Sequence, residues 1–258
     1  MTRKIVLNEN HPRYLSLLTR EKLVTGFKRG LVASEGLIAH GRGECFDYLL
    51  GECTTESARA AINVASAMLL LARYPVISVN GNVTALCADQ VCGLNRSLEH
   101  SVIEINLFYY TWEREKLISE EFKKYGLTQI LGTDPKKLVS IPELESNRRL
   151  VDRDGIYKAD VVFVPLEDGD RTMALKRMNK KVVTVDLNPL SRTALSSDIT
   201  IVDNIVRVLP QLIERIEYHR KYSSEDDLKE LVESFDNLDG LGKTLEVMKS
   251  KQVSVLQK

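Results

Sequence analysis

The densest group of residues able to do chemistry lies between Gly36 and Glu52, in the segment GLIAHGRGECFDYLLGE. This segment holds four glycines, a histidine, an arginine and three carboxylates. Glycine lets backbone N–H groups approach a ligand closely, and a guanidinium forms paired hydrogen bonds with phosphate or carboxylate oxygens. We therefore expect residues 39–43 to form a loop that binds an anion through Arg42. A polar surface turn before a short helix fits the same pattern, because glycine-rich turns are common.

His40 lies in the same segment and is the one histidine of the four in the chain with neighbours typical of a ligand site. Imidazole exchanges a proton near neutral pH, so His40 could orient or deprotonate an amine. The alternative is a histidine that only hydrogen-bonds within its loop.

Two further groups directly follow segments that we expect to be strands, where open α/β sheets bind their ligands. Asn80 and Asn82 follow the first such strand and offer two carboxamides, although an ordinary Asn-Gly turn is the simpler interpretation. Asp186 follows a later strand and could accept ribose hydroxyls, while Arg192 and Thr193 could donate to phosphate. A capped loop with a surface arginine is the alternative there.

Asp203-Asn204 opens a long helix immediately after a short apolar strand. Asn204 is typical of a helix N-cap. The same position is one at which a helix dipole attracts an anion, so both interpretations stay open.

Strand and helix patterns alternate over most of the chain. Short β-branched or continuous apolar runs predict strands, and alanine-rich or amphipathic runs predict helices. The alternation favours an open, mainly parallel α/β sheet with helices on both faces. The expected strands cover residues 75–79, 101–108, 160–165, 181–186 and 199–202, with a strand tip at 129–132. The expected helices cover residues 12–30, 54–73, 83–97, 112–126, 168–180 and 203–222.

The remaining segments complete the expected organisation. Residues 133–158 are polar and charged, and we expect an irregular surface excursion. We assign residues 1–222 to one α/β catalytic domain and 223–258 to a charged helical appendage that packs on this domain or on a partner subunit. Gly242-Lys243-Thr244 resembles the end of a P-loop, but Asn237 replaces the first glycine and a helix pattern precedes it, so we reject a nucleotide site there.

The composition is that of an ordinary globular protein, with 43% hydrophobic and 28% charged residues among 258. Lysine plus arginine and aspartate plus glutamate both number 36, which gives no support for a nucleic-acid or acidic-membrane partner. No apolar run reaches the ~18 residues that span a bilayer, and the first residues lack the apolar core of a secretion signal. We therefore expect a cytoplasmic location. The four cysteines form no CxxC pair, so we expect reduced, mostly buried thiols rather than zinc ligands.

Five segments carry a more specific signal. They are HPRYLSLLTRE (11–21), GLIAHGRGECFDYLLGE (36–52), PVISVNGN (75–82), IEINLFY (103–109) and VDLNPLSRTA (185–194). Together they resemble the archaeal phosphopantothenate synthetases, also called 4-phosphopantoate–β-alanine ligases, over most of residues 11–222. The resemblance implies a homodimer with a Rossmann-like core that joins 4-phosphopantoate to β-alanine in coenzyme A biosynthesis and splits ATP to AMP and pyrophosphate.

The resemblance also implies which residues contact ATP. They are Arg20, Arg42, Asp186, Leu187, Asn188, Arg192, Thr193, Asn204 and Ile205. Most of these belong to the loops at strand ends selected above from residue chemistry. By the same analogy, the carboxylate of phosphopantoate forms an acyl adenylate, and cationic groups with Mg²⁺ offset the charge of that step. The ligands of the metal stay unassigned.

From position alone, Asn80 and Asn82 are candidates to hold the pantoate hydroxyl and carboxylate, and His40 is a candidate to act on the amine. Two alternatives remain open at this point. One is an α/β hydrolase of a nucleotide or sugar phosphate, and the other is a non-enzymatic nucleotide-sensing module.

Overall fold

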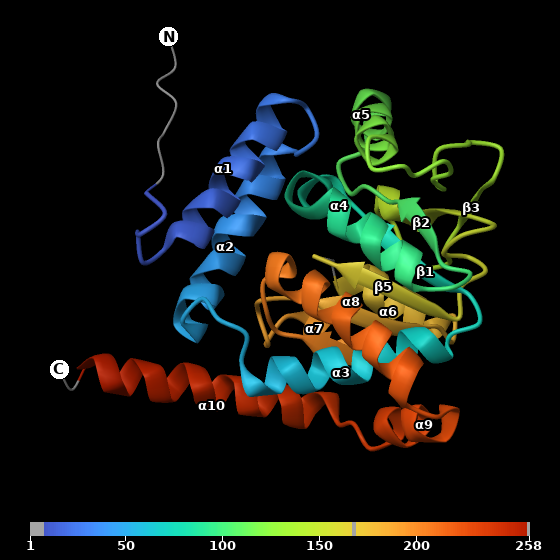
Figure 1. Cartoon of the computed structure of the whole chain (residues 1–258). Helices are drawn as coiled ribbons and strands as arrows, with labels where there is room; N and C mark the ends of the chain where they lie inside the picture. Colours follow the sequence, from blue (N-terminus) through green and yellow to red (C-terminus); the bar gives the residue numbers. More distant parts are fainter. Residues whose placement is uncertain (1–7, 167–168, 257–258) are drawn as a thin grey trace, which may run out of the picture.

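Five parallel strands form one open sheet in the computed structural model, which describes residues 8–166 and 169–256 (Figure 1). Their order across the sheet is β2-β1-β5-β6-β7. The strands are β1 (Pro75–Val79), β2 (Val102–Ile105), β5 (Val161–Pro165), β6 (Lys181–Val185) and β7 (Ile199–Ile201). The predicted open parallel sheet is confirmed. The expected strand tip at 129–132 contributes an isolated bridge between Leu131 and Glu104.

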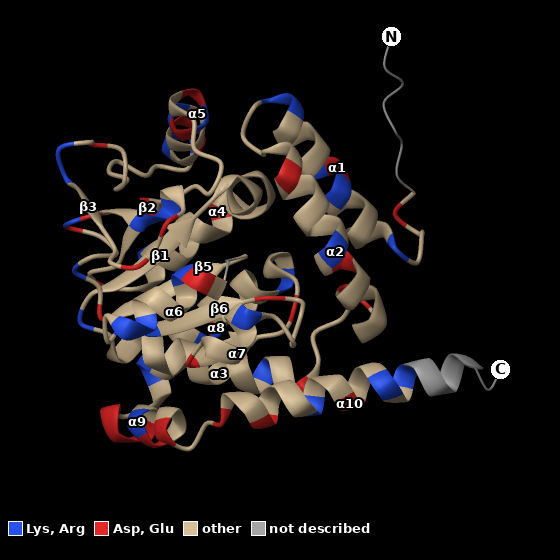
Figure 2. Ribbon diagram, turned by 180° about the vertical axis from the view of Figure 1, so that it is seen from behind, with Lys and Arg blue, Asp and Glu red and all other residues tan. Residues whose placement is uncertain are grey.

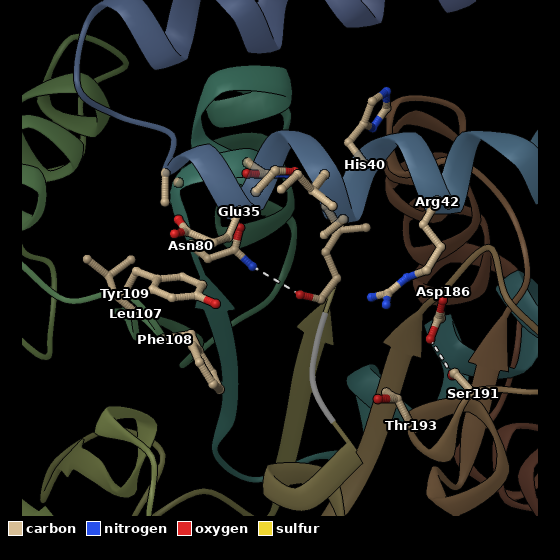
Figure 3. Close-up of a pocket in the computed structure, with 18 of the residues that line it drawn as sticks. Glu35, His40, Arg42, Asn80, Leu107, Phe108, Tyr109, Asp186, Ser191 and Thr193 are labelled. Atoms are coloured by element: carbon tan, nitrogen blue, oxygen red, sulfur yellow. Dashed lines mark hydrogen bonds between the residues drawn. The ribbon is translucent and has the colours of Figure 1, made fainter.

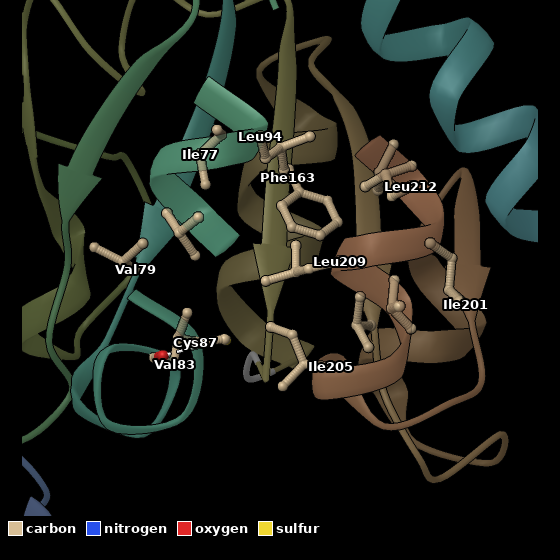
Figure 4. Close-up of a cluster of buried hydrophobic side chains, with 14 of the residues drawn as sticks. Ile77, Val79, Val83, Cys87, Leu94, Phe163, Ile201, Ile205, Leu209 and Leu212 are labelled. Atoms are coloured by element: carbon tan, nitrogen blue, oxygen red, sulfur yellow. Dashed lines mark hydrogen bonds between the residues drawn. The ribbon is translucent and has the colours of Figure 1, made fainter. Parts of the chain in front are cut away.

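Side chains alternate between the two faces of this sheet, and both faces are covered. Ile77 and Phe163 join the buried cluster formed with α4 (Gly81–Ser97) and α8 (Ile205–Tyr222) (Figure 4). Val162 joins a second buried cluster on the opposite face, which includes Leu175 of α6 (Gly169–Arg177). Burial on both faces explains why these strands are continuous apolar runs.

Several helices begin at residues whose side chains accept a hydrogen bond from the first turn. Thr55 accepts from Ala58 N at the start of α3 (Glu56–Leu71), and Thr111 accepts from Arg114 N at the start of α5 (Trp112–Lys123). A threonine oxygen at this position satisfies an otherwise unpaired backbone N–H. Asp168, the expected start of the next helix, lies outside the described residues, and α6 is described from Gly169.

The prediction of an irregular surface excursion over residues 133–158 is wrong. This segment contains an antiparallel pair, β3 (Leu138–Ser140) and β4 (Leu150–Asp152), and a short 3-10 helix, Asn147–Arg149. Ile141, Val151 and Ile156 of this segment are buried in the same cluster as α6. The few apolar residues of this segment that reach the core are separated by charged residues, so the sequence shows no hydrophobic periodicity there.

The predicted glycine loop at residues 39–43 is also wrong, since α2 (Ser34–Leu50) runs through it as a continuous helix. Together with α1 (Tyr14–Lys28), α2 forms a helical pair beside α4 (Figure 1). The buried residues of α2 are Glu44, Asp47 and Leu50, at helical spacing. Two of the three are carboxylates, so hydropathy does not reveal the buried face of this helix.

The C-terminal segment forms α9 (Glu225–Glu233) and α10 (Asn237–Leu256), which pack against α3, with α10 also contacting α2 (Figure 1). The sequence Gly242-Lys243-Thr244 lies inside α10, so the rejection of a P-loop there is confirmed. Within the described residues, no helix is both long enough and apolar enough to cross a bilayer. Residues 1–7, the first part of the segment examined for a secretion signal, lie outside the described residues.

The expectation of mostly buried thiols holds for only half of them. Cys87 and Cys92 are buried within α4, while Cys45 and Cys53 are exposed. Cys45 lies within α2, outside the buried face formed by Glu44, Asp47 and Leu50.

Candidate functional site

A cavity of about 750 Å³ opens at the carboxyl ends of β1, β5 and β6 (Figure 3). The chain runs from β1 to β2 on one side and from β5 through β6 to β7 on the other, so the cavity lies where the strand order reverses. Open α/β sheets bind ligands at such a point. Nine residues predicted from the sequence line it: His40, Arg42, Asn80, Asn82, Asp186, Leu187, Asn188, Arg192 and Thr193.

Asp186 is the most constrained charged group on the β6 side of this cavity. Its carboxylate accepts a hydrogen bond from Asn188 N at 3.0 Å and another from the Ser191 hydroxyl (Figure 3). Burial raises the pKa of Asp186, while those hydrogen bonds and the charge of Arg42 oppose the rise. The result is an oriented carboxylate beside a cation at the end of a strand, as hydroxyl recognition requires.

Arg42 projects from α2 toward Asp186 (Figure 3). Close packing of α2 on the neighbouring loop makes this possible, because a Cβ at Gly43 would lie 3.5 Å from Leu187 Cδ1. Arg192 lies on the same side, with Nη1 2.7 Å from Asp170 Oδ1. Two guanidinium groups thus flank Asp186 in the cavity wall.

Gly36 of the 36–52 segment allows close helix packing rather than loop geometry. A Cβ at Gly36 would lie 2.4 Å from Asn82 Oδ1, and the Gly36 carbonyl accepts from Asn82 Nδ2 at 2.8 Å. A glycine inside a helix costs about 1 kcal/mol relative to alanine, and here it permits contact between α2 and the start of α4. Arg42 therefore lines the cavity from a helix instead of a loop, and its predicted contact with an anion stays a prediction.

Asn80 and Asn82 line the cavity, but both carboxamides are already hydrogen-bonded. Asn80 caps α4 by accepting from Val83 N at 3.1 Å, and its Nδ2 donates to the Leu166 carbonyl at 3.2 Å (Figure 3). Asn82 donates to Gly36 as described. Their predicted contact with pantoate therefore stays a prediction.

The β2 side of the cavity contains residues that the sequence did not reveal: Glu35, Leu107, Phe108, Tyr109, Arg114 and Arg148. Arg148 is only 6% exposed and lies 6.0 Å from the centre of the Phe108 ring. Asn106 Nδ2 donates to the Arg148 carbonyl at 3.3 Å and thereby ties the 133–158 segment to the end of β2. Of these six residues, only Arg114 could have been predicted from the sequence, because it lies in the first turn of a helix that follows a strand.

Three predicted ATP contacts do not line the cavity. Arg20 Nε lies 2.8 Å from both carboxylate oxygens of Glu44, on the helical pair. Asn204 caps α8 and donates to Asp47 at 3.2 Å, so its N-cap interpretation is confirmed. Ile205 is buried in the core.

His40 belongs to the cavity wall, but Figure 3 shows its ring on the opposite side of α2 from Arg42 and Asp186. Burial lowers the pKa of His40, which favours the neutral imidazole. The His40 ring therefore points away from the centre of the cavity (Figure 3).

A buried ion network fixes α2 against the core. Arg207 Nη2 lies 2.5 Å from Asp47 Oδ1, and Arg207 Nε lies 2.8 Å from Asp203 Oδ1. Asp47 is 2% exposed and Asp203 1%. A desolvated pair with additional hydrogen bonds stabilises one arrangement, because removing one partner leaves a buried charge. Arg42 is therefore carried by a helix with a fixed position.

Within the described residues, no three His, Cys, Asp or Glu side chains come together as a metal site. The Mg²⁺ that accompanies a nucleotide is usually held by phosphates and one or two carboxylates, with water completing its shell. Glu35 is a carboxylate of the cavity wall that fits such a minimal role, whereas both oxygens of Asp186 already accept hydrogen bonds.

Comparison with known proteins identifies the family of this chain. The family model described as phosphopantothenate/pantothenate synthetase matches residues 57–251. A 4-phosphopantoate–β-alanine ligase of Thermococcus kodakarensis is 56% identical over 92% of this chain and 88% of its own length. Ligases of the same name from Thermococcus onnurineus and Methanospirillum hungatei are 53% and 44% identical, over 93% and 97% of this chain and 90% and 100% of theirs. The chain thus belongs to the phosphopantothenate/pantothenate synthetase family.

Proposed function

We propose that this chain is a ligase that joins 4-phosphopantoate to β-alanine with the energy of ATP, in coenzyme A biosynthesis. The observation that carries the proposal is its similarity, along almost the full length of both chains, to ligases with that name. The cavity supports it, because cationic and hydroxyl-binding groups meet at a strand-order reversal.

ATP binds on the β6 side in this proposal. Asp186 accepts the ribose hydroxyls, and Arg42, Arg192 and Thr193 hold the phosphates, with Leu187 and Asn188 contributing the loop backbone. This division follows from chemistry: guanidinium and hydroxyl groups donate to phosphate, and a carboxylate accepts from hydroxyls. Mg²⁺ bound together with ATP would lower the repulsion between the phosphates and the incoming carboxylate, and Glu35 would be the carboxylate available to hold it.

The reaction proceeds in two steps. The carboxylate oxygen of phosphopantoate attacks the α-phosphorus of ATP, the bond to the β-phosphate oxygen breaks, and pyrophosphate leaves. The β-alanine nitrogen then attacks the acyl carbon, the bond to AMP breaks, and the nitrogen loses its proton. The first step requires positive charge near the phosphates, which Arg42 supplies. The second requires mainly proximity, because an acyl adenylate is already reactive.

We also propose that the active form is a homodimer. The α1–α2 pair presents exposed apolar side chains to solvent, with Leu15 59% and Ile38 74% accessible. Apolar groups of this size on a helix face suit contact with a second copy. Sedimentation equilibrium measures the mass directly, and a monomer at micromolar concentration would contradict the dimer.

Pyrophosphate release tests the function itself. The ligase releases pyrophosphate continuously only with ATP, 4-phosphopantoate and β-alanine together, and up to one equivalent without the amine. A hydrolase would ignore β-alanine, and a sensor would release nothing. Either of those results would overturn the proposal.

A further inference from the structure

We infer that the C-terminal helix α10 positions the residues that bind ATP, with Asn237 acting on α7 and Lys251 acting on α2. The inference rests on the proposed function, because it concerns how the chain holds the residues to which ATP is assigned. Neither Asn237 nor Lys251 lines the cavity, so each acts through the helix that it holds. A segment that the sequence marked only as a charged appendage thus takes part in the reaction.

A stripe along one face of α10 contacts the rest of the chain. Its members recur at alternating spacings of four and three residues, which places them above one another on a helix. They are Asn237, Leu241, Thr244, Met248 and Lys251. The three in the middle are at most 6% exposed. The stripe covers fourteen residues, or about 21 Å at 1.5 Å per residue, and α10 contacts α2, α3, α7 and β7 (Figure 1).

Asn237, at the start of α10, joins β7 to the last turn of α7. Its Oδ1 accepts from Thr200 N at 2.7 Å, and its Nδ2 donates to the Ala194 carbonyl at 2.9 Å. The Thr200 hydroxyl donates to the same carbonyl at 2.8 Å. The last four carbonyls of a helix have no partner inside it, so a helix of five residues depends on such outside donors. Asn237 therefore fixes the position of α7 from behind.

The same short helix presents two of the proposed phosphate donors to the cavity. Arg192 and Thr193 are its first two residues, and both line the cavity. Ala194, whose carbonyl Asn237 holds, follows them directly and is fully buried. Hydrogen bonds to phosphate require heavy-atom distances of about 2.7–3.2 Å, so a displacement of α7 by ~1 Å breaks them.

Lys251, at the other end of the stripe, holds the last residue of α2. Its Nζ donates to the carbonyl of Leu50, the residue with which α2 ends. A cation at this place interacts favourably with the helix dipole and with carbonyls that have no partner inside the helix. Arg42 lies eight residues before Leu50 in the same helix, so the position of this helix end also sets the position of Arg42.

A small buried cluster joins the three helices between these two ends. Its buried members are Leu50 of α2, Ala194 of α7, Leu241 and Met248 of α10, and Val202 after β7. Close-packed side chains have low compressibility, so they transmit a displacement rather than absorb it. α10 therefore sets the distance between the two helices whose guanidinium groups approach the phosphates of ATP.

The test is the affinity of Asn237→Asp for ATP, measured by titration calorimetry. This substitution keeps the shape of the side chain and the bond accepted from Thr200 N, but it removes the donor to the Ala194 carbonyl. We expect Kd and KM for ATP to rise by ~5- to 10-fold. KM for 4-phosphopantoate should stay within ~2-fold of the wild type, because α10 holds the nucleotide side of the cavity. Asn237→Ala should show the same selectivity.

Asp236→Ala is the matched control at this end of α10. Asp236 Oδ1 accepts from Leu238 N at 2.8 Å and from Asp239 N at 3.2 Å, so its hydrogen bonds serve the first turn of α10 itself. Loss of a helix cap should lower the melting temperature. It should leave Kd for ATP unchanged, since the bond from Asn237 to α7 remains.

Lys251→Met tests the other end, because it keeps the aliphatic stem and removes the donor to Leu50. We expect Kd for ATP to rise by ~3-fold, and Lys249→Met, at an exposed position on the same helix, should behave like the wild type. An unchanged Kd in Lys251→Met would overturn the role assigned to Lys251.

Three results would overturn the role of Asn237: an unchanged Kd for ATP in Asn237→Asp, an equal rise in Asp236→Ala, or an equal rise in KM for 4-phosphopantoate. Thermal unfolding establishes that each variant folds, and Asn237→Ala is judged by the same criteria if Asn237→Asp does not. Calorimetry with ATP alone needs no turnover. A wild type that binds ATP but forms no product would contradict the proposed function alone, and one that binds no ATP would contradict both.

Discussion

The two sides of the cavity differ in how their residues are brought together. On the β6 side, the residues from Asp186 to Thr193 are continuous in the chain. They form the loop that follows β6 and the start of the short helix α7 (Arg192–Ser196). On the β2 side, Arg114 comes from a helix and Arg148 from an insertion 34 residues later in the chain. The first arrangement needs only local sequence, and the second depends on tertiary contacts such as those of Asn106 and Glu104.

This contrast predicts different kinetic consequences for substitutions on the two sides. Changes on the β6 side should affect ATP, and changes on the β2 side should affect 4-phosphopantoate. The α2 helix contributes residues to both sides of the cavity, so substitutions in α2 test which side binds which substrate.

The largest effect is expected for Arg42→Ala. Removing a preorganised charged donor from developing phosphate charge should lower kcat/KM for ATP by ~100-fold. KM for 4-phosphopantoate should change little, which pyrophosphate release at varied concentrations of each substrate measures. A near-normal kcat/KM for ATP would mean that Arg42 does not belong to the nucleotide site, and it would contradict the assignment of ATP to the β6 side.

A smaller effect is expected for Asp186→Asn. Loss of a charged acceptor for ribose hydroxyls should raise KM for ATP by ~10-fold. Burial raises the pKa of Asp186. As the pH is lowered, the wild-type KM for ATP should therefore begin to rise at a pH that is still above the ordinary aspartate pKa of ~3.9. The protonated carboxyl accepts less well, so the asparagine variant should lose this acid limb. An identical acid limb in both proteins would assign it to another group.

Arg20→Ala should have less effect than Arg42→Ala, although both were predicted to contact ATP. Arg20 is paired with Glu44 outside the cavity, and a partly exposed ion pair contributes ~1 kcal/mol or less. We expect a loss in kcat/KM of less than ~5-fold. A loss equal to that of Arg42→Ala would mean that Arg20 contacts a nucleotide bound in a partner subunit, because Arg20 does not line the cavity of its own chain.

The smallest effect is expected for His40→Asn, because its ring points away from the cavity centre (Figure 3). Single-turnover measurement of product formation from preformed adenylate should show a change of no more than ~2-fold, since a tenfold change needs ~1.4 kcal/mol. A markedly slower step would restore the role in amine deprotonation predicted from the sequence.

Much of the fold follows from the chain pattern, and the reasons for the failures are physical. The strands β1 and β6 were predicted at 75–79 and 181–186 because burial on both faces leaves continuous apolar runs. The helix at 34–50 was missed because two of its three buried residues are carboxylates and because it contains three glycines, of which Gly36 packs closely against Asn82. Those glycines suggested an anion-binding loop, whereas the segment is a helix held to the core by the ion pair of Asp47 with Arg207.

The candidate site was predictable to a similar degree. Residues that directly follow strands, such as Asp186, were found from position and chemistry together. Arg148 was missed because nothing local distinguishes it from the exposed Arg149 beside it. Asn204 and Arg20 were taken from a family pattern, which does not say whether a matching residue is engaged elsewhere, as both are here.

The rigidity of α2 has a consequence for which acids the cavity accepts. Glu35 and Arg42 are seven residues apart, so they share one side of the helix and are separated by about 10 Å along its axis. With Asp47 and Arg207 holding the helix in place, Arg42 keeps the nucleotide phosphates at a fixed position, so the acid must fit the length of cavity that remains beside them. A homologue one methylene longer or shorter would bring its carboxylate to the wrong place, and a misplacement of ~1 Å is enough to slow such a reaction by ~100-fold.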